Sequence, residues 1–314
     1  MSRLRSIRRL SIPMACAAPI LALSLLAPAA PTSAAIDPHT SVSSDGAAVA
    51  TNTEGVTISS GEAYSPSHQG DGKQAIGRDR QVDDMDVPPA TPDGQEVGIT
   101  SVIGADNRVR ITATTTYPYR AIAKITSSIG GCTGWLIDAN TVVTAGHCVH
   151  GGGGWATNVR VYPGRNGTST PYGSCGASRL FSVNGWTSDR DPAYDYGAIK
   201  LNCSIGNQTG WFGYRWQSAS LNGQATNLAG YPGDKTANTL WRDNDTVRST
   251  ATRRLYYAND TAGGQSGSPV WNNGANCSTC SIAVHAYGVG SNGYNGGTRI
   301  TEAVFNNLTN WKNS

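Results

Sequence analysis

Long apolar runs are scarce in this 314-residue sequence. The longest extends from about residue 12 to residue 30, and three prolines interrupt it. A membrane-spanning helix needs about 20 consecutive, mostly apolar residues. This run is therefore a poor anchor, and no later segment is apolar enough to span a bilayer. We expect a soluble protein that has no membrane partner.

The first 35 residues have the composition of an export signal. Arginines at positions 3, 5, 8 and 9 precede the apolar run, and Ser33-Ala34-Ala35 offers the small residues that a signal peptidase requires. We predict a signal peptide over residues 1–35 and a secreted, extracellular product.

Cysteine is also rare, with seven in the chain. Cys16 lies in the predicted signal, and the other six form an even set suited to an oxidising compartment. Six cysteines allow fifteen pairings, so their number does not determine the bonds. Cys277-x-x-Cys280 could indicate metal or redox chemistry. Because the chain is predicted to be exported and has no second such pair, we expect a small structural loop instead.

Charge is distributed unevenly along the chain. Residues 36–100 contain 11 acidic and 3 basic residues, a net charge of −8, whereas residues 101–314 contain 17 basic and 10 acidic residues, a net charge of +7. The acidic stretch is poor in aromatic residues, which predicts weak order on its own. We interpret residues 36–100 as a pro-segment held partly by complementary charge; a solvated linker or tail is the alternative.

From residue 101 onward, short runs rich in Val, Ile, Thr and Tyr alternate with Gly, Asn, Asp and Pro. Many short strands separated by turns predict a barrel or sandwich, not a doubly wound sheet. Near the end, Val304, Phe305, Leu308 and Trp311 fall on one helical face, and Thr301 can cap that helix. We therefore predict an all-β domain over residues 101–314, with two sub-barrels and a short C-terminal helix.

Two segments indicate nucleophilic chemistry. The first is TAGHC, which contains His147, and the second is GGQSGSPV, which contains Ser266. A serine hydroxyl is a weak nucleophile unless a base takes its proton, and acyl transfer needs donors for the developing oxyanion. His147 is the candidate base, and the N–H groups of Gly264 and Ser266 are the candidate oxyanion donors. Either segment alone could be structural; both in this order favour catalysis.

A Ser–His pair of this kind needs a buried carboxylate to orient the imidazole. Asp195, in YDYGAIKL, lies just before the apolar run Gly197–Leu201, where its side chain can be drawn inside. Asp189 and Asp191 lie in a stretch that is typical of a solvated loop. We therefore predict Asp195 as the third member.

The motifs TAGHC, YDYGAIKL and GGQSGSPV, in this order, resemble the trypsin/chymotrypsin superfamily. Within it the chain resembles the bacterial glutamyl endopeptidases of the Bacillus type, in the V8-like branch. The likeness runs from about Ser101 to the end and includes SVIGADNR, YPYRAIAKI, PGRNGTS, AGYPGDKTA, AVHAYGV and GTRITEAVFNNLTNWKNS. The resemblance implies a chymotrypsin-like double β-barrel. It also implies a serine endopeptidase that cleaves after Glu, and more slowly after Asp, through an acyl-enzyme intermediate.

The resemblance also implies residue roles. His147 is the general base, Asp195 orients it, and Ser266 is the nucleophile. His285 would meet the substrate carboxylate as a hydrogen-bond donor or as a cation, and the net positive charge of residues 101–314 would attract acidic substrates. Thr261 is predicted in the same pocket. In the family the free amino group of the mature chain lies near this pocket, which assigns that role to Ser101. Without the resemblance, His285 would be an ordinary strand histidine.

Asp260 supports a rival specificity. It precedes Ser266 by six residues, the offset at which trypsin-like enzymes carry the aspartate that selects Lys or Arg. The glutamyl endopeptidases also carry Asp at this offset, so we interpret Asp260 as a structural residue of the pocket. Gln265 replaces the aspartate that pairs with the new N-terminus in trypsin-like zymogens. A further alternative, an inactive binding protein with a protease fold, is disfavoured because all three triad candidates are present.

For the cysteines, the resemblance supports the bonds Cys132–Cys148 and Cys277–Cys280. The remaining Cys175 and Cys203 have no partners in the Bacillus pattern, and we predict that they pair with each other.

Glutamate is scarce. The chain contains four glutamates, and only Glu302 follows residue 100, against nine aspartates there. A glutamate-specific protease would benefit from having few self-cleavage sites. We predict self-cleavage after Glu96, followed by trimming to Ser101.

We expect no cofactor. The run Asp243-Asn244-Asp245 could supply oxygen ligands to a structural calcium ion, but we predict a solvated turn there. The expected partners are polypeptide substrates with acidic residues and the chain's own pro-segment, acting as an intramolecular inhibitor or chaperone. We expect no nucleic-acid partner and a monomeric protein.

Overall fold

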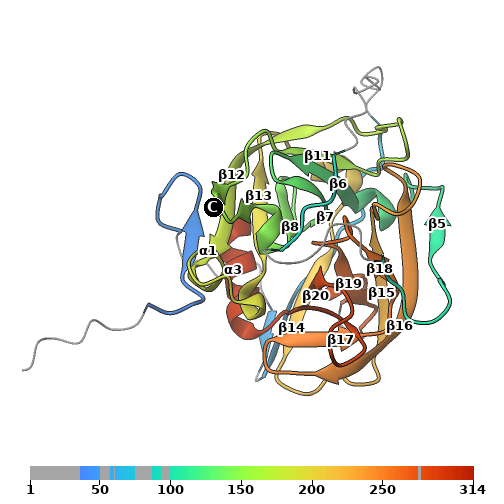
Figure 1. Cartoon of the computed structure of the whole chain (residues 1–314). Coiled ribbons are helices and arrows are strands. Elements are labelled where there is room, and N and C mark those ends of the chain that lie inside the picture. The colour runs from blue at the N-terminus through green and yellow to red at the C-terminus, as the bar shows by residue number, and fades with distance from the viewer. Residues whose placement is uncertain (1–35, 50–56, 60, 75–86, 93–99, 275–276) are drawn as a thin grey trace, which may run out of the picture. The chain divides into compact units, whose positions relative to one another are not determined.

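The computed structural model describes residues 36–49, 57–59, 61–74, 87–92, 100–274 and 277–314 (Figure 1). The predicted signal peptide and Glu96 lie outside the described residues. Within the described ranges, no helix is both long and apolar enough to cross a bilayer.

Six antiparallel strands of the first half of the domain form a closed barrel. They are β6 (Ile122–Ser127), β7 (Gly130–Leu136), β8 (Thr141–Thr144), β11 (Arg160–Pro163), β12 (Cys175–Val183) and β13 (Gly197–Leu201). Pairing of β12 with β13 closes the ring. Every residue of β7 is buried, because this strand lies between the barrel interior and the second half of the domain. A short hairpin, β9 (His150–Gly151) and β10 (Gly154–Trp155), follows β8.

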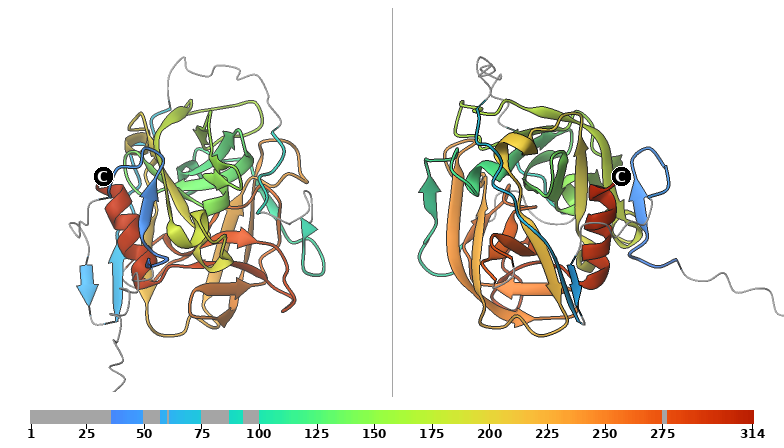
Figure 2. Two further views of the ribbon diagram at one scale, coloured as in Figure 1. Left: turned by 60° about the vertical axis from the view of Figure 1, so that its left-hand side comes forward. Right: turned by 180° about the vertical axis from the view of Figure 1, so that it is seen from behind.

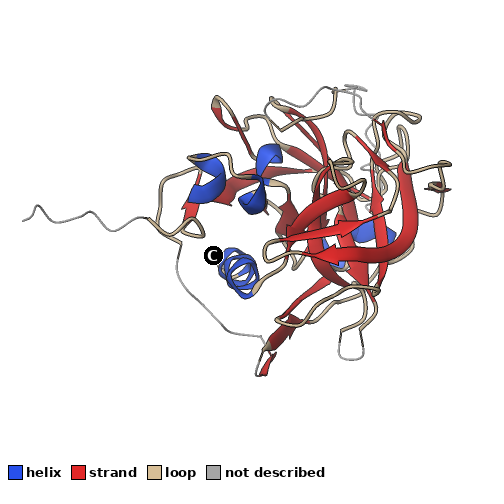
Figure 3. Ribbon diagram, turned by 60° about the horizontal axis from the view of Figure 1, so that its bottom comes forward, coloured by secondary structure: helices blue, strands red, loops and turns tan. Residues whose placement is uncertain are grey.

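The second half forms another closed ring of six strands. They are β15 (Ala225–Gly230), β16 (Leu240–Thr250), β17 (Arg254–Tyr257), β19 (Pro269–Asn272), β20 (Cys280–Tyr287) and β21 (Asn295–Arg299). Pairing of β19 with β20 closes it. Strands β14 (Gly213–Gln217) and β5 (Val109–Ile111) add to its outside, and β4 (Thr100–Ser101) pairs with β18 (Thr261–Ala262). The predicted all-β, two-barrel fold is confirmed (Figure 3).

Helical structure is sparse, as predicted. Short turns of helix occur in the connections: η1 (Tyr119–Ala121), η2 (Gly146–Cys148), α1 (Asn184–Thr187), η3 (Pro192–Tyr194) and α2 (Gly206–Thr209). The one long helix of the described residues is α3 (Glu302–Lys312), whose first turn is capped by the side chain of Thr301. Its buried face contacts both halves of the domain, because Trp311 stacks on Phe181 of β12 and Phe305 contacts Tyr214 of β14. The predicted C-terminal helix is confirmed.

The acidic segment adds strands to both barrels. Strand β1 (Ser41–Ser43) pairs with β12, and the hairpin of β2 (Thr57–Ser59) and β3 (Glu62–Ser65) pairs through β3 with β14. Figure 2 shows β1 beside α3, where Trp311 Nε1 donates to Ser41 Oγ. An ion pair of 2.9 Å joins Arg179 to Asp45. Backbone hydrogen bonds of β1 and β3 therefore hold the acidic segment against the domain, in addition to the complementary charge that the sequence suggests.

The Asp243–Asp245 run is not the solvated turn that we predicted. It lies inside strand β16, paired along its length with β15. Asp243 Oδ2 accepts the backbone N–H of Asp260 at 2.7 Å, and burial raises the pKa of this carboxyl group. The composition is typical of a turn, but pairing with β15 and this buried hydrogen bond override it.

The three predicted disulfides are all present. The Cα–Cα distances are 6.2 Å for Cys132–Cys148, 6.1 Å for Cys175–Cys203 and 5.6 Å for Cys277–Cys280. The first bond joins β7 to η2, the turn that carries His147, so it fixes this turn to the barrel wall.

Candidate active site

His147 is held at two points by one carboxylate. Its Nδ1 lies 2.8 Å from Asp195 Oδ2, and its backbone N–H donates to Asp195 Oδ1 at 2.9 Å. A carboxylate at Nδ1 favours the tautomer that carries its proton there, which leaves a lone pair on Nε2. An imidazole held in this way can act as a base through Nε2.

Asp195 is fully buried between η3 and β13. Its main-chain oxygen accepts a hydrogen bond from Thr298 Oγ1 at 2.9 Å. Gly146 allows the close approach of the histidine turn, because a Cβ atom there would lie 3.0 Å from Asp195 Oδ1 and 2.8 Å from the Trp186 ring. Of the rival carboxylates, Asp189 is exposed, and Asp191 accepts the backbone N–H of Ala193.

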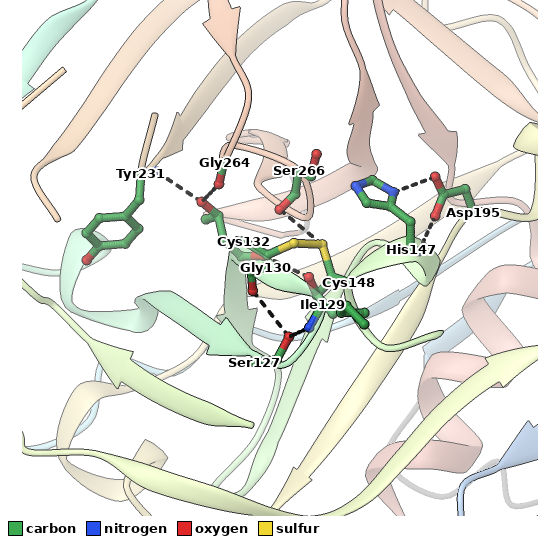
Figure 4. The surroundings of a disulfide bond; sticks show 12 residues. Ser127, Ile129, Gly130, Cys132, His147, Cys148, Asp195, Tyr231, Gly264 and Ser266 are labelled. Atoms are coloured by element: carbon green, nitrogen blue, oxygen red, sulfur yellow. Dashed lines mark hydrogen bonds and ion pairs between the residues drawn. A yellow bond between two sulfur atoms is a disulfide. The ribbon is translucent and has the colours of Figure 1, made fainter. Parts of the chain in front are cut away.

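Ser266 lies on the opposite side of the imidazole from Asp195 (Figure 4). The ring of His147 turns its second nitrogen toward the serine, and this Nε2 is buried without a hydrogen-bond partner in the described part of the chain. The Ser266 carbonyl accepts the N–H of Thr133 at 2.9 Å, which ties the serine loop to β7 of the first barrel. Carboxylate, imidazole and hydroxyl therefore follow one another across the junction of the barrels.

The loop before the serine presents free backbone donors. Gly264 has φ +94°, and a Cβ atom at this position would lie 2.6 Å from the carbonyl oxygen of Tyr231. The N–H of Gln265 donates to Ala262, but within the described residues no hydrogen bond uses the N–H of Gly264 or Ser266. Two such donors beside a nucleophile can hold a developing oxyanion.

His285 lies on β20, and its side chain is buried. Its Nδ1 lies 2.7 Å from the hydroxyl of Tyr257. Burial, with smaller contributions from His147 and Arg254, lowers the pKa of His285 to about 3. Of the two roles that the sequence left open, donor or cation, this environment favours the neutral donor. Tyr257 was not predicted, because no motif marks it.

Ser101 and Thr261 lie opposite each other in the short β4–β18 ladder, and both are buried. Asn295 Nδ2 donates to the Ser101 carbonyl at 2.7 Å, and the N–H of Val289 donates to Ser101 Oγ at 3.3 Å. Gly288, three residues after His285, abuts this hydroxyl, because a Cβ atom there would overlap it. Ser101 and its ladder partner Thr261 therefore lie near the C-terminal end of β20, the strand that carries His285.

Asp260 is buried, and backbone donors already occupy its carboxylate. The N–H of Ile103 donates to Oδ1 and the N–H of Asn107 donates to Oδ2, each at 2.8 Å. A carboxylate that selects a Lys or Arg side chain must have acceptor positions free for it. The bonds to Ile103 and Asn107 therefore favour a structural role for Asp260.

A sequence profile of the trypsin family matches residues 107–313. The chain belongs to the trypsin family. As a member of this family, it is a serine endopeptidase, an enzyme that acts on polypeptides. It is 48% identical over 295 residues to a glutamyl endopeptidase of Bacillus licheniformis, which covers 90% of this chain and 91% of the relative.

A solved structure described as a Glu endopeptidase in complex with MPD is similar to the chain with a TM-score of 0.63 and 33% identity. The match covers 68% of this chain and all of that one.

A Bacillus subtilis protein named extracellular metalloprotease is 43% identical, with 90% of both chains covered. Among the described residues, Cys132, His147 and Cys148 place candidate metal-ligand atoms within 4.8 Å of one another. Both sulfur atoms are joined in the disulfide, so neither is available as a thiolate. This trio is therefore not a metal site.

Proposed function

We propose that the protein is a secreted endopeptidase that cleaves after Glu, and more slowly after Asp, with Ser266, His147 and Asp195 as its catalytic residues. The observation that carries the proposal is the Asp195–His147 hydrogen bond, with the free Nε2 facing Ser266. The identity to a glutamyl endopeptidase supports the substrate class.

In the proposed reaction, Ser266 Oγ attacks the scissile carbonyl while His147 Nε2 takes the hydroxyl proton. Asp195 stabilises the resulting imidazolium, and the N–H groups of Gly264 and Ser266 hold the oxyanion. The C–N bond then breaks as Nε2 returns the proton to the leaving amine, which gives an acyl-enzyme. A water molecule, deprotonated by the same nitrogen, attacks the ester; the ester bond breaks and the proton passes back to Ser266.

In the specificity pocket, neutral His285 donates Nε2–H to the substrate carboxylate, and the Tyr257 hydroxyl donates to Nδ1 and fixes this tautomer. Thr261 lines the pocket beside Ser101. Once processing frees the Ser101 amino group, that group supplies positive charge near the bound carboxylate.

We further propose that residues 1–35 are a signal peptide, residues 36–100 a pro-segment and residues 101–314 the protease. The disulfides, and the name of the B. subtilis relative, support secretion. The pro-segment also reaches the barrel wall near the active site: the N–H of Ala90 donates to Gly131 at 3.0 Å, and the N–H of Gly131 donates to Pro88 at 2.8 Å. Such docking suits an intramolecular inhibitor or chaperone. We propose a monomer without a cofactor and without nucleic-acid or membrane partners.

Peptides that differ only at the cleaved residue test the substrate class. The enzyme secreted from the full-length chain should cleave after Glu faster than after Asp, and should leave Gln and Arg peptides intact. Preferred cleavage after Arg would overturn the proposal. N-terminal sequencing of the same preparation should give Ser101, and a mature chain that starts upstream of residue 97 would contradict the processing route.

A further inference from the structure

Strands β17, β21 and β20 lie side by side, and their two faces carry different side chains. Gly297 pairs with His285, whereas Gly296 pairs with both Tyr256 and Tyr287. Neighbouring residues of a strand point to opposite faces. The register shifts between His285 and Tyr287, so these two side chains, although two residues apart, lie on opposite faces. The face of His285 is the proposed specificity pocket.

The opposite face holds a fixed positive charge. The guanidinium of Arg254 lies 4.5 Å over the Tyr287 ring and 5.6 Å from the Tyr256 ring. Gly296 leaves room for it, because a Cβ atom there would lie 3.0 Å from Arg254 Nη2. Its Nε is buried without a hydrogen-bond partner, and no carboxylate among the described residues forms an ion pair with it. Two aromatic rings thus orient a cation that has no ion-pair partner in the described part of the chain.

The Arg254 guanidinium lies near the catalytic centre, because the Tyr287 ring that it covers is close to His147. The centroids of the Tyr287 and His147 rings are 6.4 Å apart. We number substrate residues backward from the cleaved one, which is position 1. If position 1 occupies the His285 face, an extended peptide directs positions 2 and 4 to the opposite face. The side chain at position 2 then lies against His147. The side chain at position 4 lies about 7 Å further along the extended peptide, where the Arg254 guanidinium covers Tyr287.

We propose that Arg254, clamped between Tyr256 and Tyr287, forms a second acidic subsite that selects a carboxylate at position 4 of the substrate. This inference rests on the proposed function, since it takes the His285 face as the pocket for position 1. It adds a preference for a second acidic residue upstream of the cleaved bond.

Peptides with Glu at position 1 and Glu, Gln or Ala at position 4 test the subsite. The enzyme secreted from the full-length chain should show a kcat/KM about three- to tenfold higher for Glu than for Gln at position 4, the range of a partly exposed charge pair. Arg254→Gln should bring this ratio to about one, and Arg254→Lys should retain part of it. High salt should reduce the wild-type ratio.

Arg253→Gln is the matched control. Arg253 is the adjacent arginine, but its guanidinium lies 4.9 Å over the ring of Tyr194, so the variant should keep the wild-type ratio. The rate of modification of Ser266 by an uncharged sulfonyl fluoride should be the same in all variants, which checks that the site is intact.

Two results would overturn the subsite: a Glu/Gln ratio that is unchanged in Arg254→Gln, whether or not kcat/KM falls equally on both peptides, or an acidic preference at position 2 or 3 instead of position 4. Failure of the proposed function is distinguishable from these results. It would appear as a different residue required at position 1, and the position-4 ratio can be measured on whichever peptide is cleaved.

Discussion

The hydroxyl of Tyr257 and Nδ1 of His285 lie 2.7 Å apart inside the second barrel. Because both side chains are buried, the hydrogen bond holds the His285 imidazole in one orientation. Burial also lowers the pKa of His285, so the ring stays neutral where a surface histidine would change its charge near neutral pH.

The lowered pKa of His285 predicts how stability changes with acid. Burial lowers this pKa from 6.5 to about 3, so between these values the unfolded chain binds a proton that the folded chain does not. Stability is therefore lost as the pH falls below about 6.5, by up to about 1.4 kcal/mol per pH unit from this group. In urea titrations from pH 7 to pH 4, wild type should lose stability faster than His285→Gln. Parallel curves would contradict the buried, neutral state.

Asp260→Asn tests the structural role of this carboxylate. The amide would place an N–H₂ group against the backbone donors of Ile103 or Asn107, so one buried N–H loses its acceptor. We expect a loss of about 1–3 kcal/mol in the free energy of unfolding, measured in urea, and no change in the preference for Glu over Arg peptides. If wild type cleaves Arg peptides and the variant does not, Asp260 is the specificity residue instead.

Gly264→Ala tests the oxyanion loop. The added Cβ atom would lie 2.6 Å from the Tyr231 carbonyl at a backbone φ of +94°, so the peptide unit must turn and redirect its N–H. We expect kcat to fall by about 10²–10³-fold, the cost of losing one oxyanion donor. Gly153→Ala is a matched control, because nothing lies within 4 Å of a Cβ atom there. Full activity in Gly264→Ala would remove Gly264 from the proposed hole.

Removing the Cys132–Cys148 bond should affect both stability and catalysis. The bond closes a loop with a sequence separation of 16, for which chain entropy gives about 3 kcal/mol. The double serine variant should lose about this much stability, and it should lose activity because η2 carries His147. The Cys277–Cys280 bond spans a separation of only 3, so its double serine variant should lose less. Equal losses would argue against the loop-closure explanation.

Much of this protein could be predicted from local sequence signals. TAGHC and GGQSGSPV indicate His147 and Ser266, because each motif is a local pattern of a few residues. The first places a histidine next to a cysteine, and the second places a serine in a glycine-rich loop. Asp195 follows from its place before an apolar strand, and α3 from the spacing of Val304 to Trp311.

Tertiary contacts determine the rest. The Tyr257–His285 hydrogen bond joins residues 28 apart in the sequence, and the Arg254 clamp depends on the register shift in β20. Asp243 pairs with the Asp260 backbone inside a strand, against its turn-like composition. Strand addition by β1 and β3 was also not predictable from an acidic, Gly- and Ser-rich segment, because its hydrogen bonds are made by the backbone.

In the proposed reaction His147 activates the hydroxyl of Ser266, and mass spectrometry after treatment with a serine-directed phosphonate checks this step. We expect one adduct per active enzyme on the peptide that contains Ser266, loss of peptide cleavage in step with its formation, and neither adduct nor cleavage in Ser266→Ala. An adduct on another residue, or peptide cleavage that persists in Ser266→Ala, would rule out Ser266 as the nucleophile.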